Sequence, residues 1–204
     1  MSKLLKELSK INTSETVPEN LIVEQIIKCI NDSGYMFTEI NVTKPWGCYF
    51  RFGEQDEQRF LGEFFPDVDL AHSELGIRGD LSLKILLADP GQGLSWQYHR
   101  RRSEIWAFIT EGAYKRSMNN KEGSKRKAFT GDVVQFKPLE RHRLIGCDHA
   151  YTLVAEIWQH TNPDNLSDEE DIVRLIDDYS RVSKKTLFLA KASDFISNSI
   201  HSFK

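Results

Sequence analysis

The chain has 204 residues, of which 40% are hydrophobic and 28% charged, and its formal net charge at pH 7 is -3. This length suits one domain with its own core, and the composition is that of a folded globular protein. A general nucleic-acid-binding protein would carry a basic surplus, and no apolar stretch is long enough to cross a bilayer. We therefore expect neither nucleic acid nor a membrane as partner.

The cysteines indicate a reducing environment. Cys29, Cys48 and Cys147 are odd in number and form no CxxC pair, so they are expected to be free thiols. The first residues carry charges and do not resemble a signal peptide. These features together predict a cytoplasmic protein.

Residues 1–34 are expected to be helical and to pack on the main domain. Thr16 to Glu19 matches a capping box with Pro18 in the first turn, and Gly34 is a natural stop. Apolar residues between them follow helical spacing. They are Leu21, Ile22, Ile26, Cys29 and Ile30. Such a helix most simply covers a sheet or an edge strand, with partner binding as the alternative.

Residues 35–162 are expected to form a β-domain. Short runs rich in β-branched and aromatic residues alternate there with Gly, Pro, Asn and Asp. Several short strands with turns between them predict a sandwich or barrel, of which the jelly roll is one form. The strand runs are 49–52, 81–87, 105–109, 133–136 and 152–158, with a hairpin tip at 119–123 and an ordered insertion at 53–80.

Residues 163–204 are expected to form a C-terminal helix and a tail. Ser167 to Glu170 matches a second capping box, and apolar residues from Ile172 to Tyr179 follow the spacing of one helical face. The remaining residues, 182–204, are weakly patterned. They would pack as a strand or short helix, a segment suited to the interface of a homodimer.

Four side chains are candidate metal ligands. Gln97 and His99 would share one face of a strand, because successive side chains of a strand point to opposite sides. Glu104 follows on the neighbouring run, and His142 lies far downstream. Imidazoles and carboxylates are ordinary ligands for divalent metals, and an amide oxygen suits harder ones. Each residue alone is more often a surface residue than a ligand, so the interpretation depends on their combination.

The residues around these candidates resemble the cupin superfamily. Gly112 closes the first block, and Gly131, Pro138 and His142 form the second. More closely, Leu-Ser-Trp-Gln-Tyr-His followed by Arg-Ser-Glu-Ile-Trp, ending at Trp106, resembles the signature of type II mannose-6-phosphate isomerases.

Two further segments carry the same resemblance. Residues 44–47 resemble the entry motif of that family, and residues 170–181 resemble its closing motif. The blocks occur in the family's order over roughly residues 44–181. No segment resembles the nucleotidyltransferase half that precedes this module in bifunctional members. The chain departs from the family pattern at Arg101, Ile105 and Glu140.

The resemblance implies a mostly β fold, the cupin double-stranded β-helix or jelly-roll barrel, with helices at both ends. It implies one divalent metal ion, with zinc favoured over manganese, iron, nickel and cobalt. The implied ligands are Gln97, His99, Glu104 and His142. The implied reaction interconverts mannose 6-phosphate and fructose 6-phosphate, or a related aldose and ketose phosphate, through an enediolate.

A sugar-phosphate isomerase also needs an anion site and a base. Arg102 matches the family motif and is the preferred phosphate contact, because a guanidinium binds two oxygens at once. Lys84 and Arg143 are further candidates for binding the small phosphorylated sugar. Glu156, which matches a family glutamate, is the one candidate catalytic residue. For Arg174 and Arg181 in the closing motif, a surface helix with salt bridges explains the charges equally well.

Two other functions stay open. A cupin that binds a metal and a carbohydrate without turnover, as a sensor or structural module, would need the same residues. A cupin with oxygen-dependent cleavage usually has a His-rich site, against which Gln97 argues. Fold alone does not decide between them. A requirement for the phosphorylated sugar would separate the isomerase from the binding module.

Overall fold

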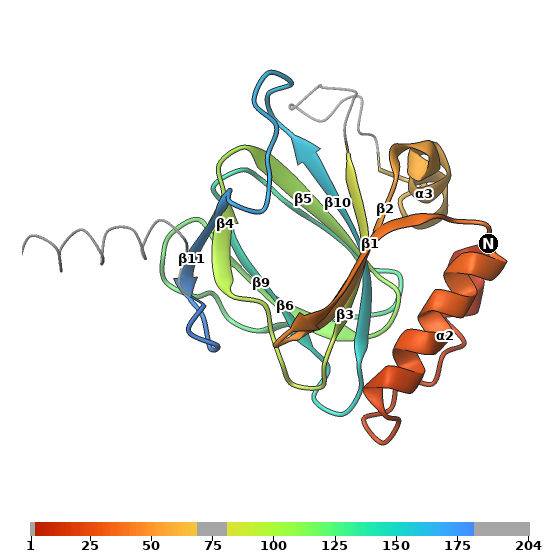
Figure 1. Cartoon of the computed structure of the whole chain (residues 1–204). Coiled ribbons are helices and arrows are strands. Elements are labelled where there is room, and N and C mark those ends of the chain that lie inside the picture. Colours follow the sequence, from red (N-terminus) through yellow and green to blue (C-terminus); the bar gives the residue numbers. More distant parts are fainter. Residues whose placement is uncertain (1–2, 69–80, 182–204) are drawn as a thin grey trace, which may run out of the picture.

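Two antiparallel sheets face each other in the computed structural model, which describes residues 3–68 and 81–181 (Figure 1). The larger sheet has the order β1-β2-β3-β10-β5-β8 and the smaller one β11-β4-β9-β6-β7. The strands of the larger sheet are β1 (Phe37–Lys44), β2 (Gly47–Phe52), β3 (Ser82–Ala88), β10 (Thr152–His160), β5 (Arg102–Phe108) and β8 (Val133–Phe136). Those of the smaller sheet are β11 (Ile172–Ile176), β4 (Trp96–His99), β9 (Arg141–Gly146), β6 (Gly112–Ser117) and β7 (Arg126–Ala128).

Eight of these strands have the jelly-roll order. Successive strands from β3 to β10 alternate between the sheets, except that β6 and β7 are neighbours in the smaller one, so that β3-β10-β5-β8 faces β4-β9-β6-β7. The predicted mostly β, double-stranded β-helix fold is therefore confirmed. The two sheets are separate hydrogen-bonded units over the described residues, so this jelly roll is a two-sheet sandwich whose sheets do not close into a barrel.

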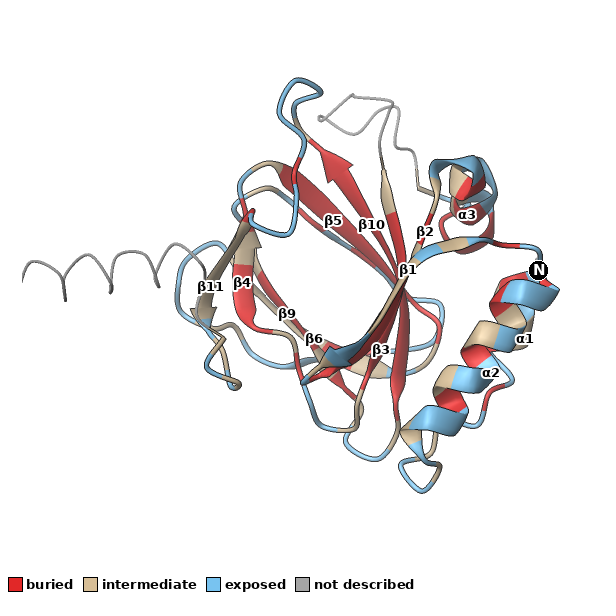
Figure 2. Cartoon of the chain, viewed as in Figure 1, coloured by how far each residue is buried: buried red, intermediate tan, exposed pale blue. Residues whose placement is uncertain are grey.

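The central strands of the larger sheet are buried on both faces. Its side chains alternate, so Ile85, Ile105 and Leu153 point to one side and form an apolar cluster with the helices. Trp106 and Val154 point to the other side and belong to a second cluster between the sheets. Every residue of β5 and β10 is buried (Figure 2). This explains the uninterrupted apolar runs 105–108 in β5 and 153–155 in β10.

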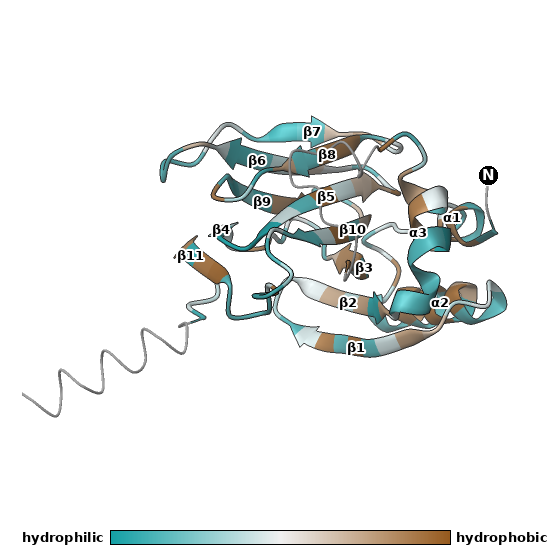
Figure 3. Cartoon of the chain, turned by 90° about the horizontal axis from the view of Figure 1, so that it is seen from above, coloured by the Kyte–Doolittle hydropathy of each residue, from teal (hydrophilic) through white to brown (hydrophobic). Residues whose placement is uncertain are grey.

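The helices cover the outer face of the larger sheet, away from β11 (Figure 3). They are α1 (Lys3–Leu8), α2 (Glu19–Asp32) and α3 (Glu57–Phe64), the last preceded by the 3-10 turn Glu54–Asp56. Their positions are fixed by the buried Glu63, which accepts hydrogen bonds from Tyr35 Oη at 2.6 Å and Leu5 N at 2.7 Å.

The predicted N-terminal helix is present as α2, but its predicted start is wrong. The N-cap is Pro18 and no side chain caps the helix, so Thr16 forms no capping box. Ile22, Ile26 and Ile30 are buried as the spacing predicts, whereas Leu21 is exposed. Among the described residues no helix is long and apolar enough to span a membrane.

The predicted C-terminal helix is wrong. Residues 172–176 form β11, which pairs antiparallel with β4. Ser167 to Glu170 starts a turn and not a helix, because Asp168 Oδ1 accepts hydrogen bonds from the backbone N–H of Glu170 and Asp171. The apolar spacing fits a helix, but β-branched residues and the open edge of β4 favour a strand.

The predicted strands and hairpin tip agree with the structure. The five strand runs correspond to β2, β3, β5, β8 and β10, and the hairpin tip lies between β6 and β7. The insertion is ordered as α3 over its first part. Residues 69–80 of that insertion and the tail 182–204 lie outside the described residues.

Gly47 closes the tight turn between β1 and β2, and replacing it tests the geometry of that turn. Its φ is +132°, and a Cβ there would overlap the backbone carbonyl of Leu87. We expect Gly47→Ala to lower the free energy of unfolding by about 1–3 kcal/mol. Gly62→Ala in α3 is the control, because nothing lies within 4 Å of a Cβ there. It should keep or raise stability, by up to about 1 kcal/mol. Urea denaturation measures both, and equal effects would contradict the turn geometry.

Candidate metal centre

Two imidazoles and a carboxylate meet between the sheets. His99 ends β4, Glu104 lies in β5 and His142 lies in β9. His99 Nε2 is 3.0 Å from Glu104 Oε1, and His142 Nε2 is 3.2 Å from Glu104 Oε2. No more than 2% of any of the three residues is exposed. The carboxylate therefore stands between the two rings, away from solvent.

Backbone carbonyls fix the tautomer of each ring. His99 Nδ1 lies 3.1 Å from the carbonyl oxygen of Asp171, and His142 Nδ1 lies 3.0 Å from that of Glu140. Because a carbonyl oxygen only accepts, each Nδ1 carries the hydrogen and donates. In the neutral form of each ring, the Nε2 atom presents a lone pair to Glu104.

The protonation states of His99 and Glu104 bring hydrogen-bond acceptors together. Burial lowers the pKa of His99 to about 4, against the opposing attraction of Glu104. Burial would raise the pKa of Glu104, but His99, Arg102 and His142 together hold it well below the ordinary value. Near neutral pH the cluster therefore contains a carboxylate that faces the lone pair of an unprotonated His99 ring.

These acceptors fit a divalent cation. Glu104 Oε2 and His142 Nε2 are buried without a hydrogen-bond partner in the described part of the chain. One ligand atom from each of the three residues lies within 4.8 Å of the others. Imidazole nitrogens and a carboxylate oxygen are the ligands that borderline divalent metals bind. The buried group can therefore bind one metal ion.

Gln97, the fourth predicted ligand, lies at the edge of this cluster. Its amide oxygen accepts a hydrogen bond from Ser95 Oγ at 2.6 Å, and its Nε2 is 3.4 Å from His99 Nε2. The amide oxygen thus faces Ser95 and not the cluster. The structure brings three of the four predicted ligands together and leaves Gln97 on the adjoining wall.

Arg102 orients Glu104. It is 1% exposed, and its Nε donates to Glu104 Oε1 at 2.9 Å. Its Nη1 donates to Ser167 Oγ at 2.8 Å and to the carbonyl of Asp168 at 3.0 Å, and its guanidinium lies 3.5 Å above the ring of Trp158. Donors that hold a metal-binding carboxylate in this way set its direction and charge. Most of the guanidinium is therefore already engaged within the protein.

Asp171 joins the segment before β11 to the metal ligands. Its carboxylate accepts hydrogen bonds from the backbone N–H of Arg100 at 3.1 Å and of Arg101 at 2.9 Å. Ser167 Oγ donates to the same carboxylate at 2.8 Å. The Asp171 carbonyl is the one that holds His99. This one residue therefore fixes the turn after β4 and the ring at its end.

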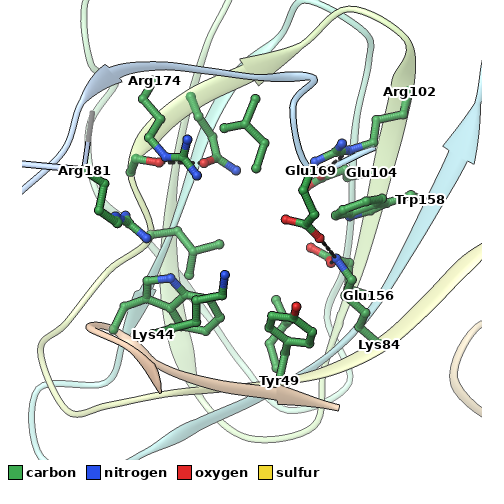
Figure 4. Close-up of a pocket in the computed structure, with 16 residues that line it drawn as sticks. Lys44, Tyr49, Lys84, Arg102, Glu104, Glu156, Trp158, Glu169, Arg174 and Arg181 are labelled. Carbon is green, nitrogen blue, oxygen red and sulfur yellow. Dashed lines mark hydrogen bonds and ion pairs between the residues drawn. The ribbon is translucent and has the colours of Figure 1, made fainter. Parts of the chain in front are cut away.

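A cavity opens beside the cluster (Figure 4). Its empty volume is about 490 Å³ with the solvent-open part included. Its lining is rich in charge. The basic residues are Lys44, Lys84, Arg102, Arg174 and Arg181, and the acidic ones are Glu104, Glu156 and Glu169.

Arg174 and Arg181 line the cavity, although a surface helix explained them equally well in the sequence. Because β11 is a strand, Arg174 points toward the cavity, and Arg181 follows from the next turn (Figure 4). The Nε of Arg174 is buried without a hydrogen-bond partner among the described residues. Arg181 is held by Asp177, with Nη2 to Oδ1 at 2.6 Å. Their place in the closing motif was the signal that could have identified them.

The opposite wall carries Lys84 and Glu156. Lys84 Nζ lies 3.8 Å from Glu156 Oε2 and 3.1 Å from Glu169 Oε1, and Trp106 Nε1 donates to Glu156 Oε1 at 3.0 Å. Burial, and next the charge of Glu104, raises the pKa of Glu156 to about 7. Burial lowers the pKa of Lys84 in spite of the two nearby carboxylates.

Arg143 lies away from the cavity. Its guanidinium pairs with Glu122 at 3.2 Å and with Asp178, and it is not a lining residue. Of the predicted substrate-binding residues, Arg102 and Lys84 line the cavity and Arg143 does not.

The three departures from the family pattern also lie off the cavity. Arg101 pairs with Asp168 at 3.0 Å, and Ile105 packs in the cluster beneath the helices. Glu140 pairs its carboxylate with Arg116, while its backbone carbonyl holds His142. A carbonyl is available from any residue, so this change preserves the tautomer of His142.

Comparison with known proteins gives only distant likenesses. No family model matches the chain, and no curated protein matches it. A Cupin 2 conserved barrel domain protein from Salinispora arenicola is 16% identical, with 59% of this chain and 81% of that chain covered and a TM-score of 0.39. A protein with a double-stranded β-helix domain from Klebsiella pneumoniae is 19% identical (45% and 78% covered, TM-score 0.36). An oxalate oxidase in complex with glycolate is 18% identical (47% and 46% covered, TM-score 0.37). The similar structures include cupins, but the fold assignment rests on the strand order.

The cluster predicts which histidines hold metal. His99→Ala or His142→Ala should reduce the bound divalent metal of the purified protein from stoichiometric to trace amounts, because two ligands hold a metal far less tightly than three. His149→Ala is the matched control, since the side chain of His149 is 85% exposed and lies outside the cluster. Elemental analysis measures all three variants. Full metal content in the first two would remove this site.

The pKa values predict how acid affects the metal-free protein. His99 has a pKa near 4 when folded, against about 6.5 when unfolded, so between these values the unfolded chain binds more protons. The free energy of unfolding should therefore fall as the pH is lowered through this window. The depressed pKa of Glu104 adds a loss in the same direction at lower pH. In urea denaturation, His99→Gln should show a flatter pH dependence; an unchanged slope would contradict a buried neutral imidazole.

Proposed function

We propose that this protein is a metal-dependent sugar-phosphate isomerase. Its reaction would interconvert mannose 6-phosphate and fructose 6-phosphate, or a related aldose and ketose phosphate, through an enediolate. The observation that carries the proposal is one cavity with Glu104, the carboxylate of the His-Glu-His cluster, and Glu156 on one side and two arginines on the other (Figure 4). A sugar phosphate has reacting oxygens at one end and a phosphate dianion at the other. The reacting end would lie at the carboxylates and the phosphate at the arginines.

One divalent metal would be held by His99, Glu104 and His142. A metal bound there supplies a Lewis acid that polarises the carbonyl and hydroxyl oxygens of the substrate. Three protein ligands leave one position open in a tetrahedral zinc site, so zinc stays the favoured metal. Manganese, iron, nickel and cobalt accept more ligands and are the alternatives, with Gln97 close enough to join them if its amide turns over.

We assign the phosphate to Arg174, Arg181 and Lys44 in place of Arg102. Arg102 already serves Glu104 and the loop before β11. Burial, and next the charge of Arg181, lowers the pKa of Arg174, so an anion between the two guanidiniums would relieve their repulsion. Guanidiniums bind phosphate through paired donors, and Lys44 would add a point charge from the end of β1.

We assign the transfer of the carbon-bound proton to Glu156. Its carboxylate lines the cavity, and a pKa of about 7 suits a group that takes and returns a proton near neutral pH. Trp106 Nε1 donates to one carboxylate oxygen, and the other, 3.8 Å from Lys84 Nζ, is the one we assign to the substrate. Glu156 would take the proton from the carbon beside the carbonyl and return it to the neighbouring carbon.

The proposal is tested first by turnover. With added divalent metal, the purified protein should convert mannose 6-phosphate to fructose 6-phosphate in a coupled assay. Activity should stop with a chelator and be absent with unphosphorylated mannose. Binding of the sugar phosphate without conversion would instead identify a non-catalytic metal- and carbohydrate-binding cupin.

The phosphate site makes a separate prediction. Arg174→Ala and Arg181→Ala should each raise KM for the sugar phosphate by about 10-fold or more, because each removes a charged hydrogen-bond donor worth roughly 1.5–3 kcal/mol. The change in kcat should be smaller. Arg126→Ala, at an exposed position on β7, is the matched control. Steady-state kinetics measure all three, and an unchanged KM in the first two would place the phosphate elsewhere.

A further inference from the structure

Lys84 is a buried amine in the wall of the cavity. Only 3% of the residue is exposed, and it stands directly opposite Glu156 in the register of β3 and β10. Directly opposite residues of an antiparallel pair share a face of the sheet. The amine and the carboxylate therefore lie side by side, and both line the cavity (Figure 4).

We propose that Lys84 is a second catalytic residue, which carries a proton between the two reacting oxygens of the substrate while Glu156 carries one between the two carbons. This inference rests on the proposed isomerase function. It gives a role to a buried charge that the metal centre and the phosphate site do not use.

The surroundings of Lys84 hold the amine in place. Its Nζ lies 3.2 Å from the ring centroid of Trp158 and 5.1 Å from that of Tyr49. The charged groups that face it are Glu156 on β10, Glu169 in the loop before β11, Arg51 on β2 and Arg102 on β5. Burial of an ion pair is seldom a net gain in stability over apolar residues. The amine therefore calls for a functional explanation.

The chemistry requires a group of this kind. When Glu156 takes the proton from C2 of the aldose, the C–H electron pair forms a C1–C2 double bond. The carbonyl π pair moves onto O1, which takes a proton from the Lys84 ammonium. The O2 hydroxyl then gives its proton to the neutral Lys84 amine as C2=O2 forms. The double-bond pair takes the proton of Glu156 at C1, so both residues return to their starting states.

Other cations that line the cavity suit this task less well. Arg102, Arg174 and Arg181 are guanidiniums, which do not release a proton in proteins. Lys44 is an amine, but it extends from the end of β1, less buried than Lys84. Burial lowers the pKa of Lys84, so that this ammonium gives up its proton more readily than an exposed lysine.

The test uses two substitutions in the full-length, metal-loaded protein. Lys84→Met removes the charge at similar length, and Lys84→Arg keeps the charge but cannot pass on a proton. Both should lower kcat by about 100-fold or more with a smaller change in KM, as expected for loss of a general acid–base group. Lys127→Met, at an exposed position on β7, is the matched control and should keep wild-type kinetics.

The pH profile separates catalysis from structure. Wild-type kcat should fall on the alkaline side as the Lys84 ammonium loses its proton, and this limb should disappear in both variants while metal content stays at the wild-type level. Wild-type kcat and an unchanged alkaline limb in Lys84→Arg would overturn the role of Lys84 and leave the proposed function standing. If Lys84→Met does not fold, Lys84→Arg decides, because it keeps the charge between the two glutamates. No turnover by the wild-type protein would instead remove the proposed function itself.

Discussion

The site depends on the contact between one carboxylate and two imidazoles whose lone pairs are turned toward it. Two backbone carbonyls enforce that direction, by accepting from the Nδ1 atoms of His99 and His142. Arg102 holds Glu104 from the side, so the carboxylate cannot turn away. Buried acceptors that face one another are unfavourable unless a cation lies between them. The fold thus keeps together acceptors that a bound divalent cation would satisfy, and the loop after β10 and the turn after β4 hold them in place.

The same alternation that builds the core also builds the cavity. On the inner face of the larger sheet, Trp106 and Val154 pack in the apolar cluster between the sheets, while Glu104, Glu156 and Lys84 lie toward the other end. The antiparallel register places each of two glutamates beside a tryptophan, since Glu104 pairs with Trp158 and Glu156 pairs with Trp106. The charged end is therefore carried on rigid, fully buried strands, and groups placed in this way keep their geometry better than groups on loops.

Local patterns in the sequence were sufficient for some of this site. The two-residue spacing of Gln97 and His99 indicates a shared strand face, and residue types rich in β-branched and aromatic side chains identify five strands. Interactions between distant segments decide the rest. The apolar spacing after Ile172 fits a helix, but the segment pairs with the edge of β4 and becomes a strand. Only that pairing turns Arg174 toward the cavity. In the same way, the bond from Ser95 turns the Gln97 amide oxygen away from the cluster, which no spacing rule anticipates.

Asp171 links the His99 end of the candidate metal centre to the strand that carries Arg174. Its carbonyl holds His99, and the next residue begins the strand that carries Arg174. In the proposed function, an anion bound by Arg174 would act on the same backbone that positions His99. Two ligands connected through one element share a coupling free energy, and linkage makes that coupling reciprocal. Under the proposed function, metal binding and binding of the sugar phosphate would therefore change each other's affinity by the same factor.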